Sequence, residues 1–359
     1  MRKLIISAAC IATALISIGC AKQPQVGPND ANKRYFEAWL HINGINVEPS
    51  GRGIYVIENS EGNGRAVEKE GFAFLEYTTT DLDGNITSYT NAETAKKLGE
   101  YSESTYYGPT VVNTYDGNIY AGVADMLLGM KVGGRKKVII PGWLLSYKDY
   151  ETESEYLAAS SSMESLIYDI KVKEFTNDMN KWETDSMCRF FANDKILIDG
   201  LPADEVFLNE DGHSMTIKDT IQEGFWYRQL KAPVDTAKFP SDTTIYINYT
   251  GMTLDGKVFD TTFEDVAKDF GIYSSSRTYE PVQIKWPNTD EDYTSITMGD
   301  DESEIIPGFA LTLWQMRAME SGIGVFYSTL GYGASGSGAS IPSYAPLIFK
   351  IEIVEEPEE

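Results

Sequence analysis

Two blocks of the chain look like copies of one another, and this repetition limits the folds that the sequence allows. Residues 119–130 and 305–316 each contain a β-type start, a glycine and then an amphipathic helix of about nine residues. Residues 166–172 and 347–353 each alternate apolar and polar side chains, as a strand with one buried face does. The sequence therefore predicts two tandem domains of one fold.

The composition supports more than one core and excludes several kinds of chemistry. Of 359 residues, 42% are hydrophobic, which is too much apolar material for a disordered chain. The net charge of −24 argues against nucleic acid or an anionic membrane surface as the main partner. Only two histidines, His41 and His213, and three cysteines are present, so a Ser/His/Asp triad, a zinc site and a disulfide scaffold are poorly supplied. We expect no metal and no cofactor.

The first 19 residues have the pattern of an export signal. Arg2 and Lys3 precede an apolar stretch that is short for a transmembrane helix, and a glycine and Cys20 close it. This junction resembles a bacterial lipoprotein cleavage site, although Ser17 departs from the usual leucine, and Cys20 would then carry the lipid. An ordinary signal peptide and an uncleaved anchor remain alternatives. We expect a lipid-anchored protein of the bacterial cell envelope, in the outer membrane and facing the periplasm, with surface exposure left open.

Shifts in composition and periodicity divide the chain further. A polar tether without periodicity covers residues 21–32, a helical pattern follows, and another short helix is expected around 185–191. The predicted segments are a signal peptide (1–19), a lipidated tether with a short helix (20–49), a first β-rich domain (50–176), a linker with a short helix (177–224) and a second β-rich domain (225–356).

Five motifs in the second block occur in a distinctive order and spacing. They are INYTGMTLDGKVFD (247–260), EIIPGF (304–309), LGYGA (330–334), IP (341–342) and LIF (347–349). Together they resemble FKBP-type peptidyl-prolyl cis-trans isomerases. The resemblance implies an α+β fold of two tandem FKBP-like domains, each an antiparallel β-sheet wrapped around a short α-helix, with the substrate pocket between helix and sheet. An insertion, about 264–297, departs from the short family pattern.

The resemblance also implies the residues of the site. Catalytic roles fall to Tyr249, Phe259, Asp260, Ile306, Tyr332 and Phe349, and substrate binding to Val282, Ile305, Phe309 and Ile341. Aromatic walls would grip the proline ring, while the Ile306 N–H and the Tyr332 hydroxyl would hydrogen-bond the peptide carbonyls. Phe309 stands where the family has tryptophan and Val282 where it has phenylalanine, which predicts a smaller floor and a more open wall. Small residues in the loop before Ile341 predict weak macrolide binding.

The first block carries a weaker version of this pattern. Tyr77 matches the first tyrosine of the site, but Thr87 and Ser88 replace the following phenylalanine and aspartate, and Val123 replaces the aromatic floor. The loss of two apolar walls and the acid predicts a degenerate FKBP-like domain that serves as a scaffold, a dimerisation surface or a chaperone surface.

These patterns lead to one functional hypothesis and two rivals. Isomerisation of an X-Pro bond needs only that a twisted amide be stabilised, so a chain poor in histidine is compatible with it. We expect the second domain to isomerise proline-containing unfolded or folding polypeptides and so to assist the folding of exported envelope proteins. The alternatives are a non-catalytic peptide-binding or chaperone-like lipoprotein on the same scaffold, and a purely structural envelope lipoprotein.

Overall fold

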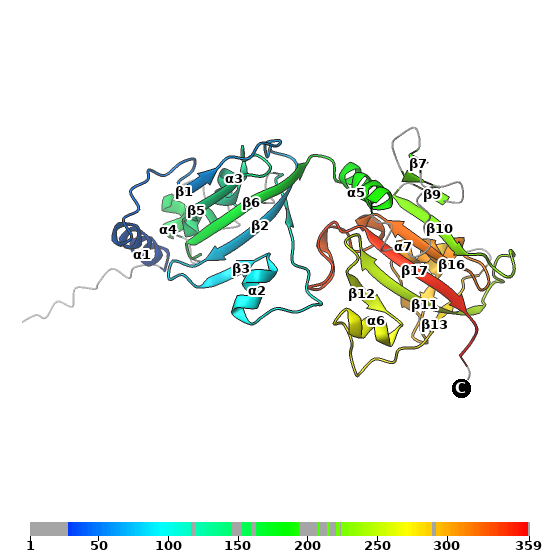
Figure 1. Cartoon of the computed structure of the whole chain (residues 1–359). Helices are drawn as coiled ribbons and strands as arrows, with labels where there is room; N and C mark the ends of the chain where they lie inside the picture. Colours follow the sequence, from blue (N-terminus) through cyan, green and yellow to red (C-terminus); the bar gives the residue numbers. More distant parts are fainter. Residues whose placement is uncertain are drawn as a thin grey trace, which may run out of the picture.

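The computed structural model describes the following residues of the chain: 28–115, 119–145, 153–158, 163–193, 207–208, 214–215, 220–222, 224–288 and 292–357. The predicted export signal, Cys20 and His213 lie outside the described residues, and the predicted linker is described only in pieces. Within the described part, two sheet domains are joined by one long helix (Figure 1). The segment boundaries predicted from the sequence remain predictions.

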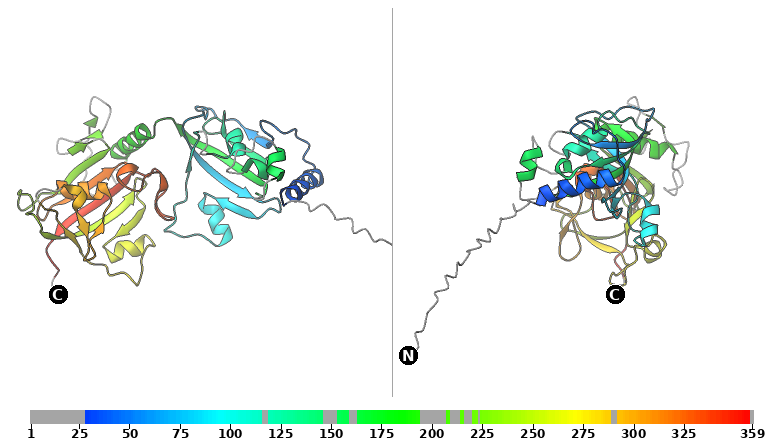
Figure 2. Two further views of the ribbon diagram at one scale, coloured as in Figure 1. Left: turned by 180° about the vertical axis from the view of Figure 1, so that it is seen from behind. Right: turned by 90° about the vertical axis from the view of Figure 1, so that its left-hand side faces the viewer.

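Helix α1 (Pro28–Ile42) begins earlier than the sequence pattern indicates, because the last five residues of the expected tether form its first turns. Proline is favourable at the start of a helix, since its φ angle already fits and it lacks the N–H that would go unpaired there. Asp30 forms an ion pair with Arg34 one turn later, with Oδ2 and Nη2 3.0 Å apart. Figures 1 and 2 place α1 at the end of the molecule that is remote from the second domain.

The first domain is a six-stranded antiparallel sheet. In chain order its strands are β1 (Tyr55–Ser60), β2 (Phe72–Thr80), β3 (Ile86–Tyr89), β4 (Thr110–Asn113), β5 (Arg135–Ile140) and β6 (Leu166–Thr176). Their spatial order is β1-β5-β6-β2-β3, and β4 also pairs with β2. The helical elements are α2 (Ala92–Leu98), α3 (Ala121–Leu127), η1 (Gly142–Leu145) and α4 (Glu153–Ala158). Helix α3 packs on the sheet through Val123, Met126 and Leu127.

The second domain has the same arrangement with a longer sheet. Its strands are β9 (Thr220–Gln222), β10 (Phe225–Lys231), β11 (Thr244–Thr253), β12 (Val258–Thr261), β13 (Val282–Lys285), β14 (Thr297–Met298), β15 (Ser303–Glu304), β16 (Ser321–Phe326) and β17 (Leu347–Val354). Its helical elements are α6 (Glu264–Asp269), η3 (Tyr293–Ser295), α7 (Pro307–Gln315), η4 (Ser328–Leu330) and η5 (Gly333–Ser335). A small separate hairpin joins β7 (Phe207–Leu208) and β8 (Ser214–Met215).

The two sheets share one topology. The order β1-β5-β6-β2 in the first sheet corresponds to β10-β16-β17-β11 in the second. The last strand of each series also pairs with two further strands: β2 with β3 and β4, and β11 with β12 and β13. A hydrogen bond from the backbone to a threonine side chain also occurs in both domains. The N–H of Tyr77 donates to Thr90 Oγ1, and the N–H of Tyr249 donates to Thr262 Oγ1, both over 3.0 Å. The predicted α+β class and the tandem repetition are thereby confirmed.

The segment expected to be an insertion in the second domain belongs to the repeated unit. In both domains a short helix, α2 or α6, is followed by two stacked tyrosine rings. The rings of Tyr101 and Tyr107 lie 5.4 Å apart, and those of Tyr273 and Tyr279 lie 5.5 Å apart. The segment therefore departs from the short family pattern in both copies, and a direct comparison of the two blocks would have found it.

The second sheet is buried on both faces, which alternation along its strands does not predict. One face packs on α7, whose Leu313 is fully buried, as expected from the sequence. The other face packs against α5 (Met179–Asn193), which contributes Met187 and Phe190 to a cluster with Ile323 and Ile348. Helix α5 is longer than the expected 185–191 segment. The linker helix thus packs as a part of the second domain.

Candidate active site

Four aromatic side chains of the second domain converge beside α7. The ring centroid of Phe309 lies 5.3 Å from that of Tyr249 and 4.9 Å from that of Phe349, and both pairs are edge to face. Phe259 packs edge to face on Phe349 at 5.6 Å. Tyr249 comes from β11, Phe259 from β12, Phe309 from α7 and Phe349 from β17. These four site residues, predicted from three of the motifs, therefore meet in space.

A glycine in β11 allows two of these rings to approach the strand. Gly251 pairs with Asp260 on one side and with Phe349 on the other. A Cβ atom at position 251 would lie 2.8 Å from the rings of both Phe259 and Phe349, closer than side chains tolerate. The glycine of the YTGM motif thus makes room for the aromatic cluster.

Three polar groups meet at the edge of the cluster. The Tyr249 hydroxyl donates to Asp260 Oδ2 over 2.7 Å, and the Arg277 guanidinium contacts both Asp260 Oδ1 and the Tyr249 hydroxyl. Burial, together with the neighbouring Asp260 charge, raises the pKa of the Tyr249 phenol, so it stays protonated and keeps its hydrogen bond at neutral pH.

Arg277 is a site residue that the sequence reasoning missed, because it lies in the segment treated as an insertion. The chain offers a signal for it. At the corresponding place of the first block stands Thr105, and Ser88 replaces Asp260 there, so the acid and the arginine are lost together.

The start of α7 brings the predicted hydrogen-bond donor to the same place. Ile306 is the N-cap residue and Pro307 the first helical residue, which leaves the N–H groups of the first turn without helical partners. In the described part of the chain, no hydrogen bond of the Ile306 N–H is found. Ile305 and Ile306 are half-buried against the core cluster that contains Tyr249, Phe309 and Phe349.

The remaining predicted residues divide into two kinds. Ile341 is buried in the same core cluster, and Val282 packs against that cluster from β13, opposite Ile247. Tyr332 lies on the loop between β16 and β17 and is 36% exposed. Burial, and to a lesser extent the charge of Asp260, raises the pKa of its phenol. The catalytic and binding roles of all these residues remain predictions.

In the first domain, other side chains occupy the position that corresponds to the aromatic cluster. Thr79 stands at the position of Gly251, since it pairs with Ser88 and Tyr168 in the same register. Its Oγ1 lies 2.8 Å from Thr87 Oγ1, where the second domain has a phenylalanine ring. Tyr77 is 6.4 Å from Tyr168, ring to ring. A hydrogen-bonded threonine pair thus takes the space of the aromatic wall.

A cavity of about 480 Å³ lies away from the aromatic cluster, where the two domains and α5 meet. Aromatic rings and prolines from all three parts line it: Phe74, Tyr106, Pro109, Trp182, Phe190, Pro342, Tyr344 and Pro346. Lys173, Arg189, Glu174 and Asp255 also line it, so both signs of charge are present.

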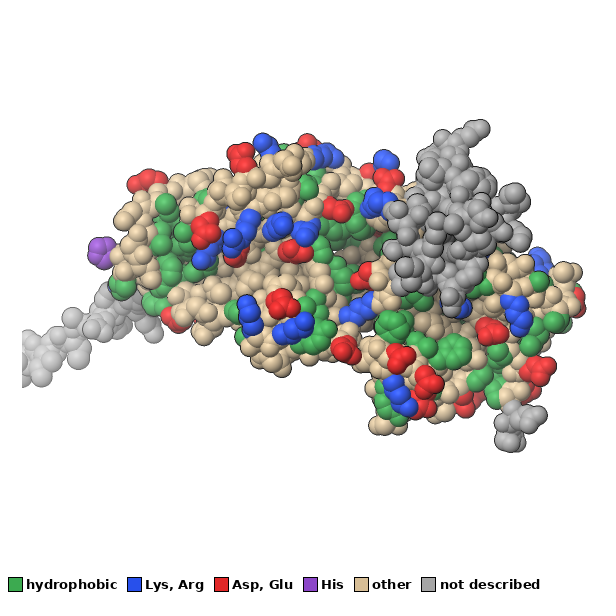
Figure 3. Space-filling model, in the orientation of Figure 1, with side chains coloured by type: hydrophobic (Ala, Val, Ile, Leu, Met, Phe, Trp, Pro, Cys, Tyr) green, Lys and Arg blue, Asp and Glu red, His purple; other side chains and the backbone are tan. Residues whose placement is uncertain are grey.

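Other classes of site find little support in the described residues. No group of three or more His, Cys, Asp or Glu side chains suited to a metal ion occurs among them. Within the same residues, no helix has both the length and the apolar character needed to cross a bilayer. Acidic and basic side chains are interspersed over the face of the first domain seen in Figure 3. Among the ion pairs of this domain, Lys173 Nζ lies 3.1 Å from Glu76 Oε1.

Comparison with family models gives a match in the second domain. Residues 285–354, from β13 to the end of β17, match the model of the FKBP-type peptidyl-prolyl cis-trans isomerase family. This match covers the part of the second domain that contains α7, β16 and β17. Because the first domain has the same strand order as the second, the chain contains two tandem FKBP-like domains. No curated protein matches the sequence.

Three solved structures are similar to parts of the chain. The three FKBP domains of wheat FKBP73 are 14% identical, with 84% of this chain and 92% of that one covered and a TM-score of 0.27. FkpA from Escherichia coli is 22% identical, with 49% and 58% covered and a TM-score of 0.28. A peptidyl-prolyl cis-trans isomerase from Pseudomonas syringae is 22% identical, with 50% and 97% covered and a TM-score of 0.27.

The FKBP-type domain supports an isomerase-like function and the binding of proline-containing peptides.

Proposed function

We propose that the second domain catalyses the cis–trans isomerisation of X-Pro bonds in unfolded or folding polypeptides. The observation that carries this proposal is the convergence of Tyr249, Phe259, Phe309 and Phe349 beside the N-terminus of α7. The family match of residues 285–354 supports the same activity.

The proposed mechanism follows from the chemistry of the amide. Partial double-bond character gives the C–N bond a rotation barrier of about 18–20 kcal/mol. The twisted amide has lost that resonance and is less charge-separated than the planar one, so it depends less on hydration. Aromatic walls that exclude water then favour the twisted form over the planar one. The Ile306 N–H and the Tyr332 hydroxyl are the groups proposed to hydrogen-bond the peptide carbonyls.

In this mechanism Asp260 is not a proton-transfer base. Its two oxygens already accept hydrogen bonds from Tyr249 and Arg277. We propose that the three side chains form a fixed polar edge, which orients the peptide against the aromatic walls.

A protease-coupled assay with a proline-containing peptide tests the activity of the full chain. We expect Phe259→Ala to lower kcat/KM at least about tenfold, equivalent to the loss of about 1.4 kcal/mol of transition-state stabilisation. Thr87→Ala, at the corresponding position of the first domain, is the matched control and should leave the rate unchanged. Isomerisation by the wild-type chain no faster than the uncatalysed rate would show that the second domain is not an isomerase.

We also propose that the protein works in the bacterial cell envelope, on exported proteins, anchored by a lipid on Cys20. The proposal rests on the export-signal pattern of residues 1–19 and the cysteine that follows. The position of α1, remote from the second domain, would let that domain stand away from the membrane (Figure 2). Metabolic labelling with a fatty acid, compared with a Cys20→Ala variant, tests the anchor. Weak macrolide binding is expected from the small side chains around Ala339.

A second candidate function is the holding of apolar peptide segments without turnover. The cavity where the domains meet favours it, because aromatic side chains at a half-open site bind apolar segments well. Suppression of the aggregation of an unfolded protein should then survive the double substitution Phe259→Ala and Asp260→Ala, whereas isomerase activity should not.

A further inference from the structure

Residues 327–346, called here the active-site loop, connect β16 to β17 and carry Tyr332 and Ile341. Two short 3-10 turns, η4 and η5, are its only helical parts among the described residues. The loop is tied to itself, because the N–H of Tyr344 donates to the carbonyl of Gly333 over 2.9 Å. This hydrogen bond helps to fix the shape of the loop. The position of the loop relative to the aromatic cluster depends on its contacts with other parts of the chain.

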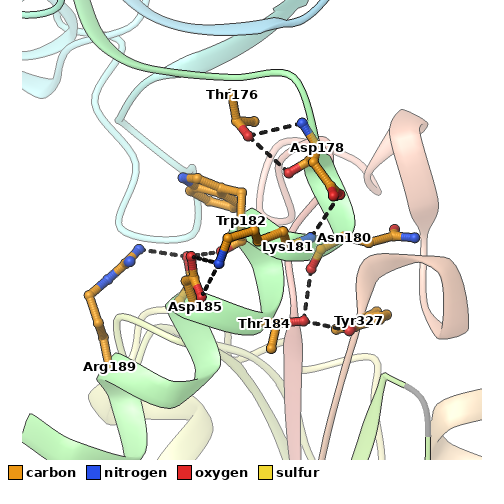
Figure 4. A network of polar contacts seen from close by, with 10 residues as sticks. Thr176, Asp178, Asn180, Lys181, Trp182, Thr184, Asp185, Arg189 and Tyr327 are labelled. Atoms are coloured by element: carbon orange, nitrogen blue, oxygen red, sulfur yellow. Dashed lines mark hydrogen bonds and ion pairs between the residues drawn. The ribbon is translucent and has the colours of Figure 1, made fainter. Parts of the chain in front are cut away.

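Helix α5 holds the beginning of the loop. Glu183 accepts hydrogen bonds from the backbone N–H and the Oγ–H of Ser328, over 2.7 and 2.8 Å. Both residues are 1% exposed, so water does not replace these bonds if they are lost. One residue further along the helix, Thr184 Oγ1 lies 2.5 Å from the hydroxyl of Tyr327 (Figure 4).

The first domain holds the end of the same loop. The N–H of Tyr106 donates to the carbonyl of Ala339 over 2.7 Å. The ring of Phe72, at the start of β2, packs edge to face on Tyr344, with centroids 5.2 Å apart. The attachment therefore involves both the backbone and a side chain, and it lies in the segment that includes Ile341.

These two attachments belong to one continuous structure. Strand β6 ends at Thr176, and the side chain of Asp178 accepts from the N–H of Lys181 over 3.0 Å in the first turn of α5 (Figure 4). The helix then buries Met187 and Phe190 against the second sheet. Between β6 and α5 there are only two residues, and α5 packs on the second sheet, so the described residues connect the two domains directly.

We propose that α5 and the degenerate first domain position the active-site loop, and hence Tyr332 and Ile341, for the isomerase site. Glu183 and Phe72 are the positioning residues, acting on the loop through Ser328 and Tyr344. The effect on catalysis rests on the proposed function, whereas the effect on the loop does not. The first domain, which lacks the aromatic cluster, would in this way support the site of the second domain.

The experiment compares full-length variants by two independent readouts. Hydrogen exchange of the active-site loop, relative to strands β5 and β6, reports its placement whether or not the protein is an enzyme. The isomerase assay reports kcat/KM. Lys181→Ala is the matched control, because Lys181 lies on the same helix with an exposed side chain that pairs only with Asp185 among the described residues.

We expect Glu183→Ala to speed exchange in residues 327–332 at least about tenfold, as for the loss of buried hydrogen bonds, and to lower kcat/KM several-fold. Glu183→Gln keeps one acceptor oxygen and should recover part of both effects. Phe72→Leu, which leaves α5 untouched, should speed exchange in 339–346 only. Lys181→Ala should change neither readout.

The outcomes separate the two proposals. If the wild-type chain has no isomerase activity but both substitutions release the loop, the proposed function fails and the positioning stands. If the wild-type chain is active and neither Glu183→Ala nor Phe72→Leu changes loop exchange or kcat/KM, the positioning is wrong. If Glu183→Ala speeds exchange in β5 and β6 as much as in the active-site loop, its effect is general and Phe72→Leu becomes the test. Unchanged exchange in residues 339–346 of the Phe72→Leu variant would then also overturn the positioning.

Discussion

Thr79 in β2 stands at the register position that Gly251 occupies in β11. Each residue pairs with a β-hairpin partner on one side, and with an aromatic residue of the neighbouring long strand on the other. The glycine leaves room for the ring of Phe259, whereas Thr79 fills that room with a side chain bonded to Thr87. One pair of positions thus separates a domain with an aromatic cluster from its copy without one.

The first prediction follows from this pair. Gly251→Ala should lower kcat/KM at least about tenfold, because a Cβ at 2.8 Å forces the rings of Phe259 and Phe349 away from their places. Thr79→Ala, the matched change in the first domain, should leave the rate within about twofold of wild type. The isomerase assay measures both, and equal rates for Gly251→Ala and the wild type would contradict this account of the cluster.

The second prediction concerns the arginine that the sequence reasoning missed. Arg277→Ala should lower kcat/KM several-fold, because Asp260 and Tyr249 lose the group that holds them in place. In an Asp260→Ala background the same substitution should have little further effect, since residues that act as one unit are not additive. Thr105→Ala is the control in the first domain. Additive losses would mean that Arg277 acts independently of Asp260.

The third prediction concerns stability and applies to both domains. Gly122 in α3 and Gly308 in α7 lie where the helix approaches the sheet, and a Cβ would come within 2.4 Å of Ile140 and 2.3 Å of Phe326 respectively. Each glycine-to-alanine substitution should lower the free energy of unfolding of its own domain by about 1–3 kcal/mol. Denaturant unfolding followed by domain-specific hydrogen exchange measures this, and an unchanged midpoint would show that the helix moves away at little cost.

The fourth prediction uses the titration of Glu183. Burial raises the pKa of its carboxyl group, and the two hydrogen bonds from Ser328 offset this only in part. A raised folded-state pKa gives stability that is present below the unfolded value, near 4.5, and is lost as the pH rises through the folded value. Relative to Glu183→Gln, the wild-type chain should therefore lose stability as the pH rises from about 4.5 towards 7.

Urea unfolding at several pH values measures this difference. Burial, together with the charge of Glu183, raises the pKa of Tyr344 above 10.0, so Tyr344 does not titrate in this range. A difference between the wild type and Glu183→Gln that stays constant, or that grows in favour of the wild type with pH, would contradict the assignment.

Much of the fold was readable from the sequence because it depends on local patterns. Alternation predicted the strands around Tyr249 and Phe349, and the repeated glycine-and-helix motif predicted α3 and α7. The motifs of the second block also named residues that meet in one cluster, since they follow one another in a fixed topology. The early start of α1 was missed because a polar stretch with prolines resembles a tether, although a proline can begin a helix.

Three features depended on contacts between segments far apart in the chain, and no local pattern contains such contacts. Arg277 reaches Asp260 only because the segment after α6 folds back over β12. Ile348 is buried because α5 covers the second face of the sheet, on which alternation along the strand predicts a solvent-facing side chain. The hydrogen bonds that Ser328 donates to Glu183 join the loop after β16 to α5.

The sequence by itself determined that there are two copies of one α+β domain and which copy keeps the aromatic residues, because periodicity and motif spacing are properties of the chain. Only the tertiary structure decided how the two copies cooperate. The attachment of the active-site loop to α5 and to the first domain arises from packing and hydrogen bonds between distant segments, and these exist only once both domains have folded.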